Sequence, residues 1–504
     1  MSIIYSNKAL KKQRALVLGG GGALGAYQAG VLRILCKRFI EEDKKKRDSN
    51  SEYDHDSKPL LFDVIAGSSI GAMNGAVLLS QYLKTGSWET AANQLEQFWT
   101  NKEKGLASTV SEDDLKDKEV GWDKWHEQSS TWGIASAEAA RRYYSVKHYV
   151  LKGAPKVYET FRKDDSRFFD PYNIWYIHKP DHLKETILNF AQCKIATSHE
   201  KNEPRLLVFS VDVSEGKTVT FDSYPKITGS RNSNHSKYET EKKREHGNDV
   251  VKYNNNNSNN DHDGVSIDHV MASGTLPEFY DYKQINGRKF WDGGLLSNTP
   301  FRELLQAHQE YWMNIVTSQT DKEGNNKNND NTRIPDLDVY IVNLHPSRRQ
   351  DLPTDHDVVK ERQNDIIYGD RSSYHDEKMA YLVAGLRDFA AQMKDLSAEA
   401  IAKVRDESDK KELREKFDDI LRKRITKTAA TSRKNLNDND DEPKYDDLLN
   451  GQYRLKVARI ERGARASYDY YADSVYGKIG DFTAQSIDRL IQEGKGDATD
   501  ASLL

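Results

Sequence analysis

A serine and an aspartate far apart in the sequence have the neighbours that ester hydrolysis needs. Ser69 lies in the pattern Gly67-Ser-Ser-Ile-Gly71, between the apolar run Leu60–Ala66 and a helix predicted for Ala72–Leu83. A nucleophilic serine must stand clear of the backbone, and a sharp strand-to-helix turn with small neighbours at Gly67 and Gly71 presents it that way. The helix start also favours a developing negative charge. The pattern therefore predicts a nucleophile at Ser69.

Asp292 is the candidate general base. It follows Lys289-Phe-Trp and precedes Gly293 and Gly294, so its carboxylate is expected where a strand turns at the edge of a sheet. Taken alone, this is an ordinary Asp-Gly turn. Beside a nucleophilic serine, desolvation would raise the pKa of the carboxylate and make it a stronger base.

Four consecutive glycines, Gly19 to Gly22, follow the apolar run Arg14–Leu18. Consecutive glycines let backbone amides approach an anion, and the helix predicted for Ala23–Ile40 adds positive potential at its start. The segment can therefore form an oxyanion hole or hold a phosphate. The candidate oxyanion-hole residues are Gly20, Gly21, Gly22, Ala23 and Gly25.

A dinucleotide-binding fingerprint also fits the spacing Gly20-x-Gly22-x-x-Gly25. That site needs an acidic residue at the tip of a strand about 20 residues later. The only candidates, Glu41 to Asp43, lie in a polar run that follows a helix. A P-loop is excluded because no Gly-Lys-Ser/Thr ends the motif.

The elements that must position these residues alternate between strand and helix. The run Arg14–Leu18, the helix after it, the run Leu60–Ala66 and the next helix predict a parallel sheet with right-handed crossovers. A hairpin is predicted from Arg205–Val213 and Lys217–Asp222, and a further buried strand from Asp336–Leu344. The expected fold class is α/β, a three-layer α/β/α sandwich with a mostly parallel central sheet.

Three segments together resemble the patatin-like phospholipase family, of a bacterial or archaeal type with an extended C-terminal region. They read LGGGGALGAYQAGVL at Leu18–Leu32, FDVIAGSSIGAMNGA at Phe62–Ala76 and ASGTLPEFYDYKQINGRKFWDGGLLSNTP at Ala272–Pro300. The resemblance covers roughly Ala15 to His345. One departure is Leu24, where many members carry Arg or Lys, which removes a basic side chain that could aid an anionic head group or intermediate.

The resemblance implies a lipid acyl hydrolase that uses a Ser–Asp dyad without histidine. Ser69 would be the nucleophile and Asp292 the general base, acting through an acyl-enzyme intermediate. The amides around Gly21, Gly22 and Ala23 would form the oxyanion hole. The substrate would be a lipid or another acyl ester, and no metal or organic cofactor is implied.

Composition and charge indicate which partners the chain favours and how its domains and polar segments are arranged. The chain has 504 residues and a formal net charge of -4, from 75 Lys and Arg against 79 Asp and Glu, so nothing favours nucleic acid as a partner. We expect a patatin-like domain at 14–346, with polar, disordered insertions near 226–264 and 321–333. A charged, mainly helical C-terminal region is expected at 355–504, and a solvated loop at Glu41–Lys58. The stretches Tyr453–Ile460 and Asp481–Glu493 are candidates for a further strand and a closing helix.

The chain shows no signal peptide and no run of about 18 apolar residues, so we expect a cytoplasmic protein that would meet a membrane only from the surface. Two cysteines, Cys36 and Cys193, cannot make a disulfide framework. Six of the eight tryptophans lie within residues 88–190. Helices packed on the sheet, or an aromatic cap over an apolar site, would both explain them. Helices are expected there at Ser136–Leu151 and Asp181–Gln192.

Two other functions remain open from the sequence. An α/β-hydrolase triad uses the chain order Ser, Asp, His, which Ser69, Asp292 and His345 also follow. Alternatively, the chain could keep the fold as a non-catalytic lipid- or nucleotide-binding protein. The sequence leaves the oligomeric state open.

Overall fold

The computed structural model describes most of the α/β core and much of the C-terminal region. The described residues are 12–49, 60–107, 153–154, 156–160, 176, 178–179, 181–225, 264–277, 279–320, 334–348, 352, 356–372, 375–421, 453–463 and 478–502. The expected insertions, apart from Gly264, and the helix expected at Ser136–Leu151 lie outside these ranges.

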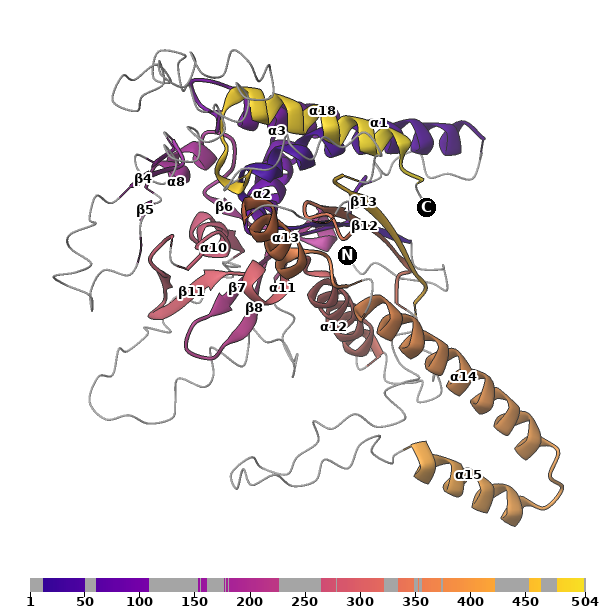
Figure 1. Ribbon diagram of the computed structural model, residues 1–504. Coiled ribbons are helices and arrows are strands. Elements are labelled where there is room, and N and C mark those ends of the chain that lie inside the picture. Colours follow the sequence, from indigo (N-terminus) through magenta and orange to yellow (C-terminus); the bar gives the residue numbers. More distant parts are fainter. Residues whose placement is uncertain are drawn as a thin grey trace, which may run out of the picture.

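A mostly parallel sheet forms the centre of the fold (Figure 1). The strands follow the order β10-β11-β7-β2-β1-β12-β13, and β8 pairs with β7. Strands β7, β2, β1, β12 and β13 run parallel, whereas β8, β11 and β10 add antiparallel neighbours at one side. Their bounds are β1 Gln13–Leu18, β2 Val64–Ser68, β7 Arg205–Asp212, β8 Lys217–Asp222, β10 Lys283–Ile285, β11 Arg288–Asp292, β12 Leu337–Asn343 and β13 Leu455–Glu461.

Helices cover both faces of this sheet (Figure 1). Alternate strand residues point to opposite faces, so Leu16 and Leu18 pack under one helical layer and Ala15 and Val17 under the other. The first layer holds α1 (Gly25–Ser49), α2 (Ile70–Thr85), α3 (Trp88–Thr100) and α18 (Ala484–Asp500), and the second holds α12 (Phe301–Thr320). The predicted three-layer α/β/α class is thereby confirmed.

Short elements complete the described chain. The strands are β3 Gly153–Ala154, β4 Tyr158–Thr160, β5 His178–Lys179, β6 Lys194–Ile195 and β9 Val265–Ser266. The helices are α8 Asp181–Leu188, α10 Ile267–Ser273, α11 Gly294–Ser297, α13 His356–Tyr368, α14 Asp376–Ala402 and α15 Glu407–Leu421. None of the helices in the described ranges is long and apolar enough to cross a bilayer.

The prediction of a loop at Glu41–Lys58 is wrong for the first half of this range, because α1 continues to Ser49. The added turns are rich in Glu and Lys, which have high helix propensity. They are also fixed to the sheet, since Arg14 on β1 donates two hydrogen bonds to Asp43, at 3.0 Å and 2.8 Å. A bidentate pair of this kind holds the helix end against the strand.

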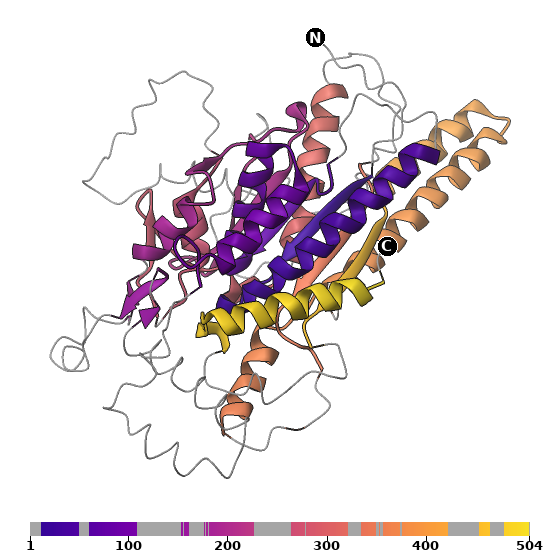
Figure 2. The same cartoon turned by 90° about the horizontal axis from the view of Figure 1, so that it is seen from above.

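The C-terminal residues contribute to the same core as the residues before 346. Strand β13 pairs in parallel with β12 along its whole length, and α18 lies along α1 (Figure 2). A Cβ on Gly494 would lie 2.1 Å from the carbonyl oxygen of Tyr27, so the two helices touch through their backbones. The domain division at 14–346 and 355–504 stays a prediction, but a strand and a helix from beyond 355 belong to the sheet and its helical layer.

Among the tryptophans of residues 88–190, Trp88 and Trp99 lie buried in α3. Trp99 donates a hydrogen bond to Asn74 Oδ1 at 2.9 Å and stacks with Phe482 at 6.3 Å between ring centroids. These two rings belong to the packed helical layer. Trp122, Trp125, Trp132 and Trp175 lie outside the described residues, so the aromatic cap stays a prediction.

Candidate active site

Ser69 lies in a strained turn at the carboxyl end of β2. Its φ of 54° and ψ of -126° belong to a region that side chains rarely adopt. The turn leads directly into α2, and the amide of Ser69 donates to Ser273 Oγ at 2.9 Å. Ser69 lines a cavity of about 130 Å³, whereas the neighbouring Ser68 is fully buried and its hydroxyl has no hydrogen-bond partner among the described residues.

Close backbone packing explains the glycines that flank Ser69. A Cβ on Gly67 would lie 2.5 Å from the carbonyl carbon and oxygen of Gly71, and a Cβ on Gly71 would lie 2.1 Å from the oxygen of Leu18. The turn is thus pressed against the end of β1. Any side chain at either position would push Ser69 away from the glycine-rich segment.

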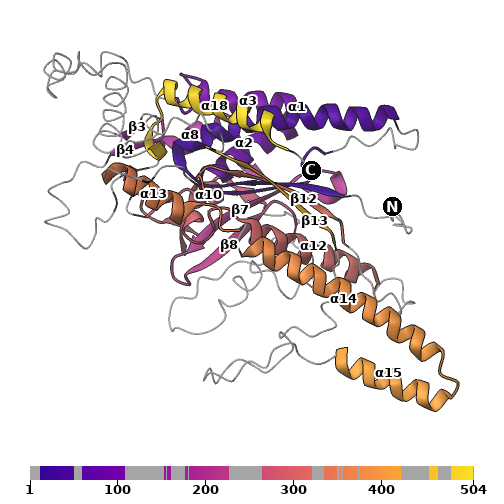
Figure 3. The same ribbon diagram turned by 45° about the vertical axis from the view of Figure 1, so that its right-hand side comes forward.

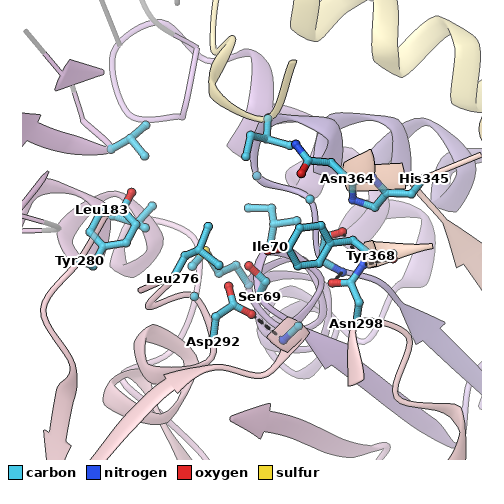
Figure 4. Close-up of a pocket in the computed structure, with 18 of the residues that line it drawn as sticks. Ser69, Ile70, Leu183, Leu276, Tyr280, Asp292, Asn298, His345, Asn364 and Tyr368 are labelled. Carbon is cyan, nitrogen blue, oxygen red and sulfur yellow. Dashed lines mark hydrogen bonds between the residues drawn. The ribbon is translucent and has the colours of Figure 1, made fainter. Parts of the chain in front are cut away.

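Asp292 faces Ser69 from the end of β11 (Figure 4). Its carboxyl Oδ1 accepts a hydrogen bond from the amide of Gly294 at 2.7 Å, and the residue is only 4% exposed. Burial raises the pKa of Asp292 to about 6, against the opposing effect of hydrogen bonds from Ser69 and Gly294. A carboxylate with this pKa is ionised at neutral pH and is a better proton acceptor than an exposed one.

Gly293 and Gly294 also have no room for side chains. A Cβ on Gly293 would lie 2.3 Å from the oxygen of Phe209, and one on Gly294 would lie 2.8 Å from Asn298 Oδ1. Strand β11 therefore turns tightly over β7, and this turn directs Asp292 into the cavity.

The glycine-rich segment lies against Ser69, since a Cβ on Gly20 would lie 2.8 Å from Ser69 Cβ. Gly20, Gly21 and Gly22 line the cavity, whereas Ala23 and Gly25 do not. A Cβ on Gly25 would collide with Ile70 and Trp99, so this glycine packs behind the site. The amides of Gly21 and Gly22 have no acceptor among the described residues, which leaves them available to an anion.

Asn298 holds Gly20, and its role was not foreseen from the sequence. The Gly20 amide donates to Asn298 Oδ1 at 3.2 Å, and Asn298 Nδ2 donates to the oxygens of Gly20 at 3.2 Å and Tyr368 at 2.7 Å. The Gly20 amide is therefore already engaged. A signal was present, because Asn298 lies in the segment Asp292–Pro300 that carries the base.

Buried amide side chains support the same segment from behind. Gln28 donates to the oxygen of Gly19 at 2.8 Å, and Asn74 donates to Gln28 Oε1 at 2.8 Å and to the oxygen of Gly25 at 3.0 Å. Trp99 in turn donates a hydrogen bond to Asn74 Oδ1. These groups fix α2, α3 and the glycine segment relative to one another, and no local sequence pattern marks them.

His345 lies elsewhere in the cavity wall. It is buried, and its Nδ1 lies 3.3 Å from Asp365 Oδ1 on α13. Figure 4 shows it beside Asn364, away from Asp292. The sequence order Ser69, Asp292, His345 is thus not matched by a spatial arrangement in which the histidine bridges the other two.

Apolar side chains form most of the remaining wall, beside Asn364 and Tyr368. They come from α2, from elements between residues 106 and 280, and from the C-terminal segment: Ile70, Met73, Leu106, Val157, Leu183, Leu276, Tyr280, Ile479 and Phe482. None of the described residues that line the cavity is Lys or Arg. The site therefore combines a serine, a buried carboxyl, free amides and an apolar wall, a set that suits an ester with a hydrocarbon chain.

A family model described as patatin-like phospholipase matches residues 16–305, which is more than half of the chain. None of the curated proteins compared with the chain matches it. The crystal structure of VipD from Legionella pneumophila is similar at 12% identity and a TM-score of 0.26, with 97% of this chain and 72% of VipD covered.

Proposed function

The chain belongs to the patatin-like phospholipase family, and from this premise we propose that it hydrolyses lipid acyl esters with Ser69 as nucleophile and Asp292 as general base. The observation that carries the proposal is the buried Asp292 carboxyl, hydrogen-bonded by the strained Ser69. Both face a cavity with an apolar wall.

The reaction begins when Ser69 Oγ attacks the ester carbonyl carbon and its proton moves to Asp292. The carbonyl oxygen becomes an oxyanion, which the amides of Gly21 and Gly22 stabilise. Asp292 then returns the proton to the departing alcohol, which leaves an acyl group on Ser69. Water attacks this acyl-enzyme as Asp292 takes its proton, and the acid is released when Ser69 recovers its hydrogen.

Two features support the dyad over a triad with His345. Within the described residues, the Asp292 carboxyl is bonded by Ser69 and Gly294, and His345 pairs with a different carboxyl, Asp365. A triad would need the imidazole between Ser69 and Asp292 to relay the proton. The substrate class is an uncharged ester with a hydrocarbon chain, because the described wall offers mostly apolar side chains and neither Lys nor Arg.

The test combines active-site labelling with turnover of a short-chain nitrophenyl ester. A fluorophosphonate should label the folded wild-type protein and not Ser69→Ala, and this would reject a purely lipid-binding role. Asp292→Asn should lose turnover by about 10³-fold or more, while His345→Ala should keep most of it. Loss of turnover in His345→Ala with activity kept in Asp292→Asn would overturn the dyad.

A further inference from the structure

A line of large apolar side chains runs along α14 and faces solvent. Its members follow intervals of three and four residues in strict alternation: Met379, Leu382, Leu386, Phe389, Met393 and Leu396. Each is between 44% and 62% exposed. Large exposed apolar patches mark interaction surfaces, and alternation of three and four is the a/d repeat of coiled coils. We call these six residues the α14 seam.

The surroundings of the seam favour a helix over a lipid surface as its occupant. A helix that lies on a membrane has a wide apolar face and a polar face rich in Lys and Arg. Here the flanking positions hold Gly385, Ala390 and Gln392, and Val383 is the one larger apolar side chain among these flanking positions of α14. The helix also carries five acidic and three basic side chains, so an anionic membrane would repel it.

We propose that the α14 seam pairs with the α14 seam of a second copy of the chain, with the two helices antiparallel. In this register Met379 lies opposite Leu396 of the second copy, Leu382 opposite Met393, and Leu386 opposite Phe389. Each of these three residue pairs then occurs twice in the dimer, as the two-fold symmetry of a homodimer requires. The seam spans about 25 Å along the helix axis.

Charges beside the seam complement one another in this register. Lys378 and Glu399 occupy equivalent flanking positions at opposite ends of the seam. Antiparallel pairing places Lys378 of each copy opposite Glu399 of the other, which gives two attractive pairs per dimer. Gly385 falls opposite Gln392, and the space where its Cβ would lie is open. This leaves room for a long side chain from the second copy.

The placement of α14 allows this arrangement. The helix extends from the body of the protein, and α15 returns beside it (Figures 1 and 3). Antiparallel pairing puts the two bodies at opposite ends of the paired helices. Parallel pairing would bring both bodies to the same end.

Sedimentation of the full-length protein over a range of concentrations tests the proposal. The wild type should form a dimer, and Leu386→Glu with Phe389→Glu should be monomeric, should still unfold cooperatively and should keep its ester turnover. Its melting temperature should not depend on protein concentration, whereas that of the wild type should rise with concentration. The matched control is Leu413→Glu, because Leu413 on α15 is also apolar and 43% exposed but lies outside the seam. This variant should remain dimeric. A wild type that is monomeric throughout, or a dimer that survives the double seam variant, would overturn the proposal.

A charge exchange tests the antiparallel register. Lys378→Glu or Glu399→Lys alone turns two attractive pairs into two repulsive ones, and each should weaken the dimer by about tenfold. The two changes together should restore wild-type affinity. Failure of this rescue would overturn the register. Seam-dependent binding of the monomer to phosphatidylcholine vesicles, with and without phosphatidylserine, would instead identify a lipid surface as the occupant.

Discussion

The side chain of Asn298 forms two hydrogen bonds with the backbone of Gly20, one to the amide and one to the carbonyl oxygen, both at 3.2 Å. These residues are 278 positions apart in the chain. A Cβ on Gly20 would lie 2.8 Å from Ser69 Cβ, so Asn298 bonds the glycine segment at the point where it lies against the serine. The segment that carries Asp292 thereby also positions the amides proposed to bind the oxyanion.

We expect Asn298→Ala to lower kcat by about 100-fold and to leave KM nearly unchanged, because misplaced amides weaken binding of the transition state more than of the ester. Asn298→Asp keeps an acceptor for Gly20 but loses both donated bonds, so it should also be impaired. The control is Asn364→Ala, since Asn364 lines the cavity from α13. Steady-state kinetics and thermal melting are the measurements, and an Asn298→Ala variant with full kcat would contradict this role.

The pH dependence of turnover should report Asp292. Because the base must be ionised and burial raises its pKa to about 6, kcat/KM should fall as the pH decreases through 6 and be constant above it. The measurement uses an ester that does not itself titrate. If the fall in kcat/KM at low pH disappears in His345→Ala, the general base would be the histidine and not Asp292.

Asp292→Asn should stabilise the fold at neutral pH. The raised pKa means that the folded state binds the proton more tightly, so the stability associated with protonated Asp292 is present below about pH 4 and is lost as the pH rises through about 6. Removing the buried charge should therefore gain about 2–3 kcal/mol in the free energy of unfolding at pH 8 and little at pH 4. Urea unfolding at both pH values measures it. An equal effect at both would rule out charge burial as the cause.

The strained backbone of Ser69 predicts an unusual order of stability. Since its φ of 54° and ψ of -126° suit glycine alone, Ser69→Gly should be more stable than Ser69→Ala by about 1 kcal/mol, although both lack the nucleophile. Ser68 is the internal control, because it lies in the extended strand β2, where alanine should be the more stable replacement. Thermal unfolding of the four variants compares them. The same order at both positions would mean that Ser69 is not strained.

Gly494→Ala should destabilise the protein even though the position lies only ten residues from the last residue, Leu504. The new methyl group would lie 2.1 Å from the carbonyl oxygen of Tyr27, and overpacking of this kind costs about 1–3 kcal/mol. Gln492→Ala on the exposed side of α18 should change the free energy of unfolding by less than about 0.5 kcal/mol. Equal stability of the two variants would show that α18 does not pack tightly on α1.

Local patterns determined the parts of the fold that depend on neighbouring residues. The apolar runs predicted β1, β2, β7, β8 and β12 to within a few residues, because a buried strand and its turns are specified by a short stretch of chain. The glycines around Ser69 and Asp292 are equally local signals, since a tight turn excludes side chains wherever it occurs. The α/β class and the family follow from these segments and their order.

Other features depend on contacts between distant segments, and only the tertiary structure decided them. The charged end of α1 is held against the sheet because Asp43 accepts two hydrogen bonds from Arg14, and the polar sequence did not reveal this contact. Asn298 bonds Gly20, which lies 278 residues away in the sequence, and Asp365 faces His345, which lies 20 residues away. Strand β13 and α18 join a core begun more than 400 residues earlier. Such contacts form because the surfaces of distant segments fit together when the whole chain packs, and the local spacing of residues does not predict them.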